Sequence, residues 1–264
     1  MLTVVLLIIT IAFQGIVAGW GRSSVRRFLV SPGRSELVDA LFVLAQLGGA
    51  FSFLTAIYAA SSLSPWFHFT TGYAASDGVL YALIYTFADY WNHRVWHTRA
   101  GWFLHRTHHS AEHFSPLLAH RNHPLQLVLE PLIRIWPLML FGFPVDVVGF
   151  VMILEYLYQM VAHCDVDHDW GWFGRWILVS PIGHRIHHSH LPEHADKNFS
   201  ILVVWDRLFG TRYDGSVLNT QVGIAEKVHN LRPVWWDLLA DAQLFFKALL
   251  RPAKSRVNPN RARG

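Results

Sequence analysis

Histidine is the residue type whose number and spacing could do chemistry in this chain. Eight of the 17 histidines fall into three short motifs, HxxxH, HxxHH and HxxHH. They are His93 and His97, then His105, His108 and His109, and later His184, His187 and His188. Because residues three and four apart share one face of a helix, each motif would present a patch of imidazoles. A lone buried histidine usually satisfies a core hydrogen bond, whereas a set of eight at these spacings indicates metal binding.

The number of ligands restricts the kind of metal site. Imidazole suits iron, zinc, copper and nickel. A structural zinc site takes four ligands and usually includes thiolates, but Cys164 is the single cysteine of the chain. Eight or nine imidazoles are too many for one ion, so a pair of metals that share the patches and keep open positions fits better.

These motifs resemble the fatty acid hydroxylase and sterol desaturase family of membrane di-iron enzymes. The family pattern is HxxxH, HxxHH, an isolated histidine after a hydrophobic hairpin, and a second HxxHH, and His163 occupies the isolated position. The similarity extends to YWNHR, to SP before HRIHHS, and to DKNFSILVVWDRLFGT from Asp196 to Thr211. It covers about residues 79–213, which we expect to be a fatty acid hydroxylase-like catalytic region.

The resemblance implies a membrane monooxygenase that uses two irons, O2 and external electrons to hydroxylate, or alternatively desaturate, a lipid-like substrate. The nine histidines named above would hold the irons, and zinc could replace iron in purified protein. The chain contains no P-loop, dinucleotide GxGxxG or Cys-based redox motif, so no nucleotide or flavin site is expected, nor a haem. Electrons would come from a ferredoxin, a rubredoxin or a small b-type cytochrome with its reductase.

This chain departs from the family pattern at two points, and each adds a histidine whose role the motifs do not assign. Relatives often read Arg-Phe-His-Pro-Leu-Glu after the first HxxHH, whereas this chain reads HRNHPLQ from His120 to Gln126, which lacks the acidic residue and adds a histidine. His123 is therefore a possible extra ligand. Some relatives also have a second histidine soon after the isolated one, and His168 could be that residue or a surface neighbour. Because His163 follows an apolar helix directly and His168 lies among aspartates, we expect His163 to be the isolated ligand.

Three polar residues could support the ligands without binding metal. Asp89 stands one helical turn before His93, where it could orient a ligand imidazole or instead pair with Arg94 or another helix. Asn198 and Asp206 occupy polar positions of the D-x-N and W-D-x-x-F-G-T motifs that the family shares. We expect supporting or structural roles for both.

Composition indicates a membrane protein. Hydrophobic residues make up 52% of the chain and charged residues 15%, and the mean hydropathy is +0.26. An ordinary soluble domain carries about 25% charged residues. The chain shows no internal repeat, low-complexity tract or long linker, which predicts one membrane-embedded domain over residues 1–264. The single cysteine excludes a disulfide framework and indicates a reducing compartment.

Apolar stretches predict an all-α, multi-pass transmembrane bundle of four to five segments with a cytoplasmic, histidine-rich helical cap. The expected spans are Leu2–Trp20, Leu37–Leu63 and Val79–His97, followed by a proline-broken hairpin over Leu125–Ala162 that crosses the membrane or only dips into it. Four arginines between the first two spans place that loop in the cytoplasm by the positive-inside rule. The histidine motifs then lie on the cytoplasmic side.

Residues 234–264 are expected to form an amphipathic helix and a basic tail. Trp235, Trp236 and Leu239 could lie in the headgroup layer of a membrane. Five Lys or Arg follow from Arg251 onward without an acidic residue. This pattern favours a contact with anionic lipids and a cytoplasmic C-terminus over binding of nucleic acid.

Other functions remain compatible with the sequence. A membrane zinc hydrolase could use the same histidines, and it would need an acidic general base, for which Glu112, Asp165 and Glu193 are candidates. Two catalytic zincs would use about six protein ligands, so eight or nine histidines favour metals of higher coordination number. A metal transporter would place its ligands near the middle of the membrane. A purely structural membrane protein fits the histidine pattern least.

Overall fold

The computed structural model describes residues 24–45, 69–134, 141–217, 221–224 and 233–250, together with six positions between 5 and 16. Most of the first and second predicted spans and the basic tail from Arg251 lie outside the described residues, and so do the side chains of residues 131–134. The predictions for those segments, and with them the orientation across the membrane, stay predictions.

The described elements are helices. They are α2 (Ser24–Val30), a helical segment over residues 34–45, α4 (Ala74–Trp96), α5 (Trp102–His109), the 3-10 helix η2 (Pro116–His120), α6 (Pro124–Arg134), α8 (Val145–Ala162), α9 (Gly171–Trp176), α10 (Pro181–His187), the 3-10 helix η3 (Pro192–His194), α11 (Val203–Leu208) and α12 (Val234–Leu249). In the described parts of the chain, extended backbone pairs only at two isolated bridges, Leu178 with Leu202 and Ser189 with Val222. The predicted all-α class is confirmed for these residues.

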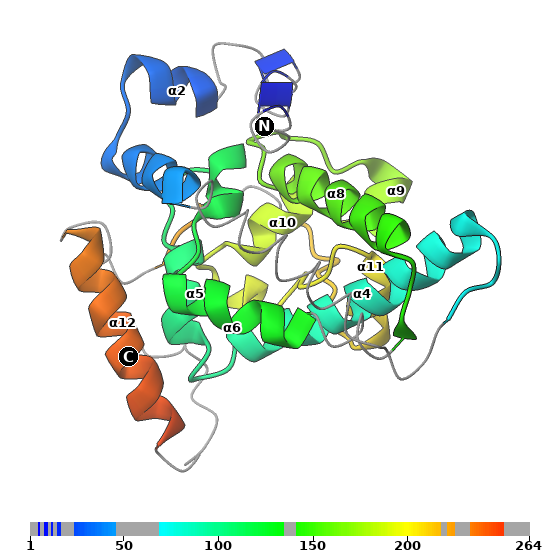
Figure 1. Cartoon of the computed structure of the whole chain (residues 1–264). Helices are drawn as coiled ribbons and strands as arrows, with labels where there is room; N and C mark the ends of the chain where they lie inside the picture. The colour runs from blue at the N-terminus through cyan, green and yellow to red at the C-terminus, as the bar shows by residue number, and fades with distance from the viewer. Residues whose placement is uncertain are drawn as a thin grey trace.

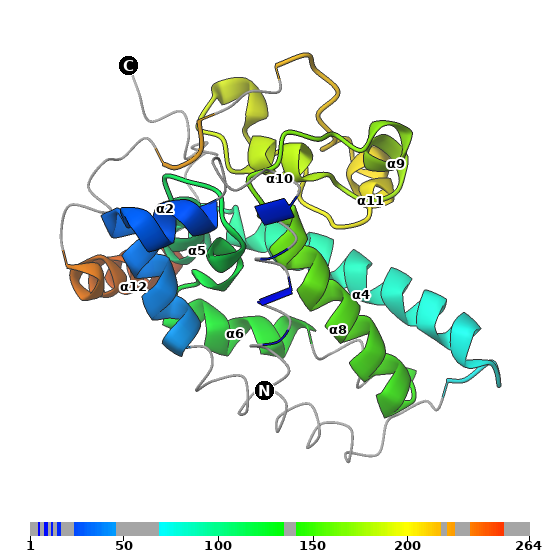
Figure 2. The ribbon, with the colours of Figure 1, turned by 90° about the horizontal axis from the view of Figure 1, so that it is seen from above.

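The two long helices α4 and α8 lie side by side and form the main apolar core (Figure 2). The core residues are Tyr81 and Tyr85 of α4, Val147, Val148 and Val151 of α8, and Phe143 just before α8. Of the helices described, α8 alone is long and apolar enough to cross a membrane, and only 28% of it is buried within the chain. The predicted third span forms as a single helix, α4, but it buries Asp77, Asp89 and Asn92 and does not meet that test.

The predicted hairpin over residues 125–162 contains α6 and α8. The 11 described residues of α6 extend about 16 Å at 1.5 Å per residue, which is shorter than the hydrocarbon core of a bilayer at about 30 Å. The 18 residues of α8 extend about 27 Å. Residues 135–140 between the two helices lie outside the described part, and the crossing of the first arm stays a prediction.

Two short helices, α5 and α10, carry the HxxHH motifs. The chain reaches α5 from α4 through a tight turn in which a Cβ at Gly101 would collide with the carbonyl oxygen of Val95, so this position requires glycine. The start of α10 is fixed by Ser180, whose hydroxyl oxygen accepts a hydrogen bond from the Gly183 amide at 3.1 Å, and by Pro181 at the first helical position. Local chemistry therefore sets where each motif begins.

Buried ion pairs attach α5 to segments that are distant in sequence. Arg106 of α5 donates from Nε to Asp241 of α12 at 2.9 Å, and α12 flanks α5 in Figure 1. Arg121 donates to Asp39 of the segment 34–45 at 2.9 Å and to the carbonyl oxygen of Thr107 at 3.1 Å. The helix that carries three histidines of the motifs is therefore joined directly to α12, and through Arg121 to the segment 34–45.

Candidate metal centre

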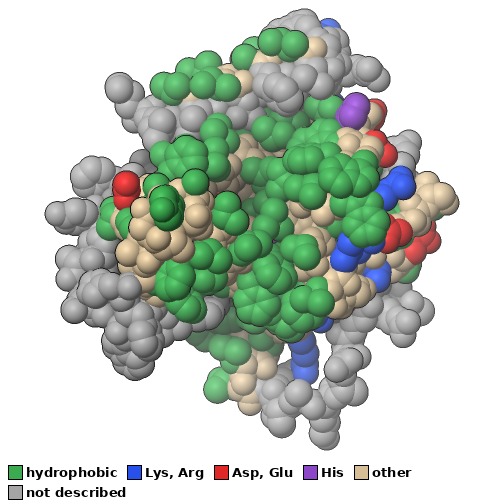
Figure 3. Space-filling model, turned by 90° about the vertical axis from the view of Figure 1, so that its right-hand side faces the viewer, with side chains coloured by type: hydrophobic (Ala, Val, Ile, Leu, Met, Phe, Trp, Pro, Cys, Tyr) green, Lys and Arg blue, Asp and Glu red, His purple; other side chains and the backbone are tan. Residues whose placement is uncertain are grey.

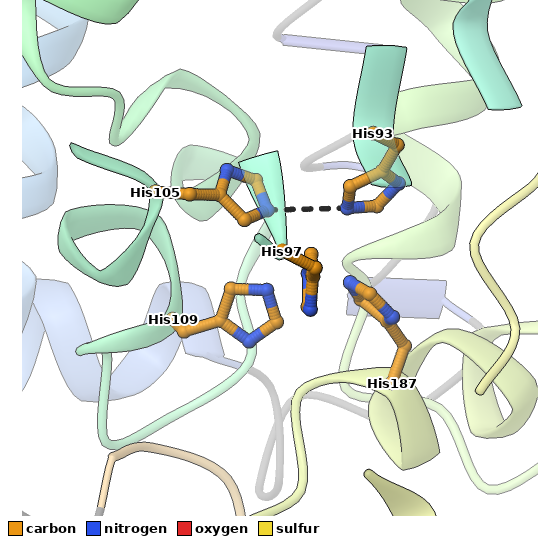
Figure 4. Close-up of side chains that lie close together, drawn as sticks. All are labelled: His93, His97, His105, His109 and His187. Atoms are coloured by element: carbon orange, nitrogen blue, oxygen red, sulfur yellow. Dashed lines mark hydrogen bonds between the residues drawn. The ribbon is translucent and has the colours of Figure 1, made fainter. Parts of the chain in front are cut away.

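The nine histidines gather in two clusters. The five-histidine cluster consists of His93, His97, His105, His109 and His187, and the four-histidine cluster consists of His108, His163, His184 and His188. Within each cluster the nitrogen atoms that could bind a metal all lie within 4.8 Å of one another. Figure 4 shows the five rings of the first cluster, which come from α4, from His97 just after it, from α5 and from α10, turned toward one shared space. The structure thus brings together the nine residues that the sequence motifs single out.

Each HxxHH motif is divided between the two clusters. At about 100° per residue, positions i and i+4 of a helix lie close together, while i+3 falls to the other side of i. In α5, His105 and His109 therefore belong to the five-histidine cluster and His108 to the other. In α10 and the residue that caps its end, His188, the assignment is reversed, because His184 and His188 belong to the four-histidine cluster and His187 to the five-histidine cluster. Each short helix supplies both clusters.

Backbone carbonyls fix the tautomer of three imidazoles. Nδ1 of His93 donates to the Phe199 oxygen at 2.7 Å, Nδ1 of His187 to the Lys197 oxygen at 2.8 Å, and Nδ1 of His163 to the Gln159 oxygen at 2.7 Å. A carbonyl oxygen only accepts, so Nδ1 must carry the proton in each ring. Nε2 then presents a lone pair to the centre of its cluster, as a metal ligand does.

The Nε2 atoms fit a metal ion in each cluster. Within the two clusters, the buried Nε2 atoms without a hydrogen-bond partner belong to His97, His109, His187 and His188. Nε2 atoms face one another at 3.1 Å between His93 and His105 and at 3.0 Å between His163 and His184. Metal–nitrogen bonds of about 2.1 Å at right angles place neighbouring ligand nitrogens about 3.0 Å apart. A bound cation would satisfy lone pairs that otherwise face each other.

Burial keeps these imidazoles neutral. Desolvation lowers the pKa of His163 to about 4, and it lowers the pKa of His108 and His188 well below the usual 6.5, with nearby imidazoles adding to the shift. The pKa of His105 and that of His187 are lowered in the same way. Since only the neutral imidazole binds a metal, the protein environment favours the ligand form at neutral pH.

The loop after η3 holds the carbonyls that orient the five-histidine cluster. Asp206 is fully buried, and its carboxylate accepts from the amides of Phe199 at 2.9 Å and Ser200 at 3.0 Å, and from the Thr211 hydroxyl at 2.7 Å. Asn198 donates to the Gly183 oxygen at 2.9 Å and accepts from the Tyr213 amide at 3.0 Å. These two side chains fix the backbone around Lys197 and Phe199.

The remaining predicted residues lie elsewhere or stay unassigned. His123 is buried but donates from Nε2 to the Leu238 oxygen at 2.9 Å and belongs to neither cluster. His168 is exposed, and its Nδ1 accepts from the Trp170 amide at 2.9 Å. The structure therefore brings His163, and not His168, to the other histidines. Asp89 is buried one turn before His93, and its supporting role stays a prediction.

Sequence reasoning did not identify the groups that orient the imidazoles. The carbonyls of Gln159, Lys197 and Phe199 are backbone atoms, so no residue type signals them. Gln126 lies against Nδ1 of His105, with its side-chain oxygen at 3.4 Å and nitrogen at 3.2 Å. The sequence marked this position as one where the chain departs from the acidic residue of relatives. That departure was the one feature of the sequence that could have pointed to Gln126 as a contact of His105.

Comparison with known proteins identifies the family. The family model described as fatty acid hydroxylase matches residues 78–211, which is just over half of the chain. The protein therefore belongs to the fatty acid hydroxylase family, and the resemblance stated from the sequence is confirmed. All nine clustered histidines lie within the matched residues, whereas α12 lies outside them.

Similar curated proteins include alkylglycerol monooxygenases. The chain is 35% identical to that of Xenopus tropicalis over 127 residues, which are 47% of this chain and 28% of the relative. It is 32% identical to that of Homo sapiens over 173 residues, which are 65% of this chain and 36% of the relative. The matched part is thus about a third of these relatives' own length. No solved structure matches the chain.

Proposed function

We propose that this protein is a membrane-bound non-haem di-iron monooxygenase that hydroxylates a lipid-like substrate, with desaturation as the alternative outcome at the same site. The observation that carries the proposal is the pair of buried clusters, in which nine neutral imidazoles turn Nε2 toward two shared centres. The names of the relatives support a monooxygenase and make an alkylglycerol the first substrate to test.

The chain's own residues would hold one iron in each cluster. When bound, the iron pair supplies activation of O2 and oxidation of an unactivated C–H bond, with electrons from an external donor. The carbonyls of Phe199, Lys197 and Gln159 keep three imidazoles in the ligand tautomer. An ion with four protein ligands keeps more open coordination positions than an ion with five. We therefore assign the positions open to non-protein ligands mainly to the four-histidine cluster. The donor is proposed as a ferredoxin, a rubredoxin or a small b-type cytochrome with its reductase.

Exposed apolar surface supports a location in the membrane. Only 28% of the apolar helix α8 is buried, and its Val145, Phe150 and Leu154 are exposed. Apolar side chains also spread across the face in Figure 3, with few charged ones at its centre. In α12, Asp237 and Asp241 are buried against the chain, whereas Trp235, Trp236 and Phe246 are each more than half exposed. Such a helix suits the headgroup layer. We propose a multi-pass protein in one membrane-embedded domain, with the clusters and the C-terminus on the cytoplasmic side.

The zinc hydrolase is less well supported by the geometry. Neither cluster includes a described carboxylate. Glu112 and Glu193 are exposed, and Asp165 pairs with Arg27 and Arg185 at 3.0 Å each. None of these three acids stands where a general base would act on a water held between the histidines, and this favours oxygen chemistry at the site.

The source of the product oxygen tests the proposal. We expect the purified, iron-loaded chain, given a reductant, a donor and an alkylglycerol or a lipid mixture, to consume O2 and to place label from oxygen-18 gas into product. Mass spectrometry of the lipid should show a gain of one labelled oxygen. Label that arrives only from labelled water would identify a hydrolase and contradict the proposal. Zinc found after purification would not, because zinc competes well with iron at nitrogen ligands.

A further inference from the structure

Gln126 is a side chain directed at a ligand of the five-histidine cluster from outside. It lies in the first turn of α6 and is buried, with 2% of its surface exposed. Three other imidazoles give their Nδ1 protons to backbone carbonyls, which substitution cannot alter. Nδ1 of His105 instead faces the side-chain amide of Gln126. This contact can therefore be changed by mutation without moving the backbone.

The chemistry of the cluster decides how this amide is oriented. Nε2 of His105 lies 3.1 Å from Nε2 of His93, toward the shared centre. With a metal bound there, both Nε2 atoms must present lone pairs, so Nδ1 of His105 carries the proton and must donate. The oxygen and nitrogen of Gln126 lie at similar distances from Nδ1, 3.4 Å and 3.2 Å, and a rotation of the amide exchanges them. Since the amide nitrogen cannot accept, the oxygen takes the proton of His105.

The neighbourhood of Gln126 keeps the amide in place. Leu125 and Leu129 of α6 pack against Trp96, Leu104 and Phe245, so α6 is fixed to α4, α5 and α12. Just before α6, His123 accepts from the Leu125 amide at 3.0 Å and donates to the Leu238 oxygen of α12. The amide therefore reaches His105 from a backbone that is held on both sides.

We propose that Gln126 is a positioning residue of the metal centre, which fixes the tautomer of His105 and, as a neutral acceptor, limits the electron donation of this imidazole to the metal. A carboxylate in the same place would hold the Nδ1 proton more strongly and make the imidazole a stronger donor. The amide thus sets a more positive reduction potential than a carboxylate would. The inference rests on the proposed function to the extent that a redox metal occupies the five-histidine cluster.

Two substitutions separate orientation from charge. Gln126→Leu removes the acceptor at similar size, and we expect iron affinity to fall about 10-fold to 100-fold, as when other partners of ligand imidazoles are removed. Gln126→Glu keeps size and acceptor but adds charge, and we expect the iron midpoint potential to shift to a more negative value with affinity retained. The same changes at Gln243, an exposed glutamine of α12, serve as matched controls.

The measurements use the full chain in detergent micelles. Iron affinity is measured by competition with chelators of graded strength, midpoint potential by a redox titration, and folding by thermal unfolding. Both expected shifts, with the Gln243 variants unchanged, support the proposal. A Gln126→Leu protein that holds iron as the unaltered chain does, or a Gln126→Glu protein with an unchanged potential, overturns it. If the unaltered chain itself binds no iron, the proposed function fails instead, so the two failures are distinguishable.

Discussion

The two histidine clusters differ in what orients their imidazoles. In the five-histidine cluster, His93 and His187 are held by carbonyls of the loop that Asp206 fixes, and His105 faces Gln126 of α6. In the four-histidine cluster, His163 is held by the carbonyl of Gln159, one turn earlier in its own segment. His93, His187 and His105 thus depend on segments outside their own helices, whereas His163 depends on local structure. Equal substitutions should therefore have unequal effects on the two metals.

The largest effect is expected from adjacent histidines of α10 that serve different clusters. We expect His187→Ala and His188→Ala each to lower turnover by about 100-fold or more, since removal of a ligand should cost at least as much as removal of its partner. His188→Ala leaves three imidazoles in its cluster and should lose that metal, whereas His187→Ala leaves four and should retain more. Metal per chain, measured by mass spectrometry, checks the difference. Full activity of either variant would remove that residue from the ligand set.

A smaller effect, confined to one cluster, is expected from Asp206→Asn. The carboxylate now accepts hydrogen bonds from backbone amides and a hydroxyl. The NH2 group of asparagine would face some of these donors with a donor, at a cost of about 1–3 kcal/mol for each buried group left unsatisfied. We expect a lower unfolding temperature and weaker metal binding in the five-histidine cluster, with the four-histidine cluster retained.

Asp214→Asn is the matched control for that substitution. Asp214 is exposed and pairs with Arg207 at 3.3 Å, and an exposed ion pair contributes about 1 kcal/mol or less. We expect its metal content to be unchanged. Equal loss of both metals in Asp206→Asn would show that the loop supports the whole centre, and the contrast between the clusters would then be wrong.

The smallest effect is expected from His168→Ala. This side chain is exposed, lies outside both clusters and accepts one hydrogen bond from the Trp170 amide, so its removal should leave metal content and activity nearly unchanged. His163→Ala, in contrast, should be inactive because it removes one of four ligands. Turnover of the two variants under the same conditions decides between them. The opposite pattern would show that the isolated histidine of the motif has been misplaced by five residues.

The sequence predicted the helical class and the set of histidines better than their arrangement. Spacing placed His105, His108 and His109 on one helix, but only the three-dimensional structure shows that they divide between two clusters. That division depends on how α5 and α10 approach each other, which involves contacts between residues far apart in sequence. The acceptors of Nδ1 were not predictable from residue type, since most are backbone oxygens.

The ion pairs that attach the flanking segments to the centre could not be predicted from the sequence either. Asp39 lies in the predicted span Leu37–Leu63, and in the structure it pairs with Arg121, which is 82 residues further along the chain. Asp241 was not singled out, because an acidic residue in an amphipathic helix ordinarily faces water, yet it is fully buried against Arg106. The outward face of α12 is consequently the apolar one. Hydropathy reports how apolar a helix is, but not which face its partners cover.

The buried Nε2 atoms without partners connect metal supply to the amount of folded protein. Each is a polar atom removed from water without a hydrogen bond, so the metal-free chain loses stability that an ion would restore. A ligand at 100 times its dissociation constant stabilises the folded state by about 2.7 kcal/mol. On the proposed function, cells short of iron would hold more of this protein in open states that proteases can degrade. Its abundance would then follow iron supply even at a constant rate of synthesis.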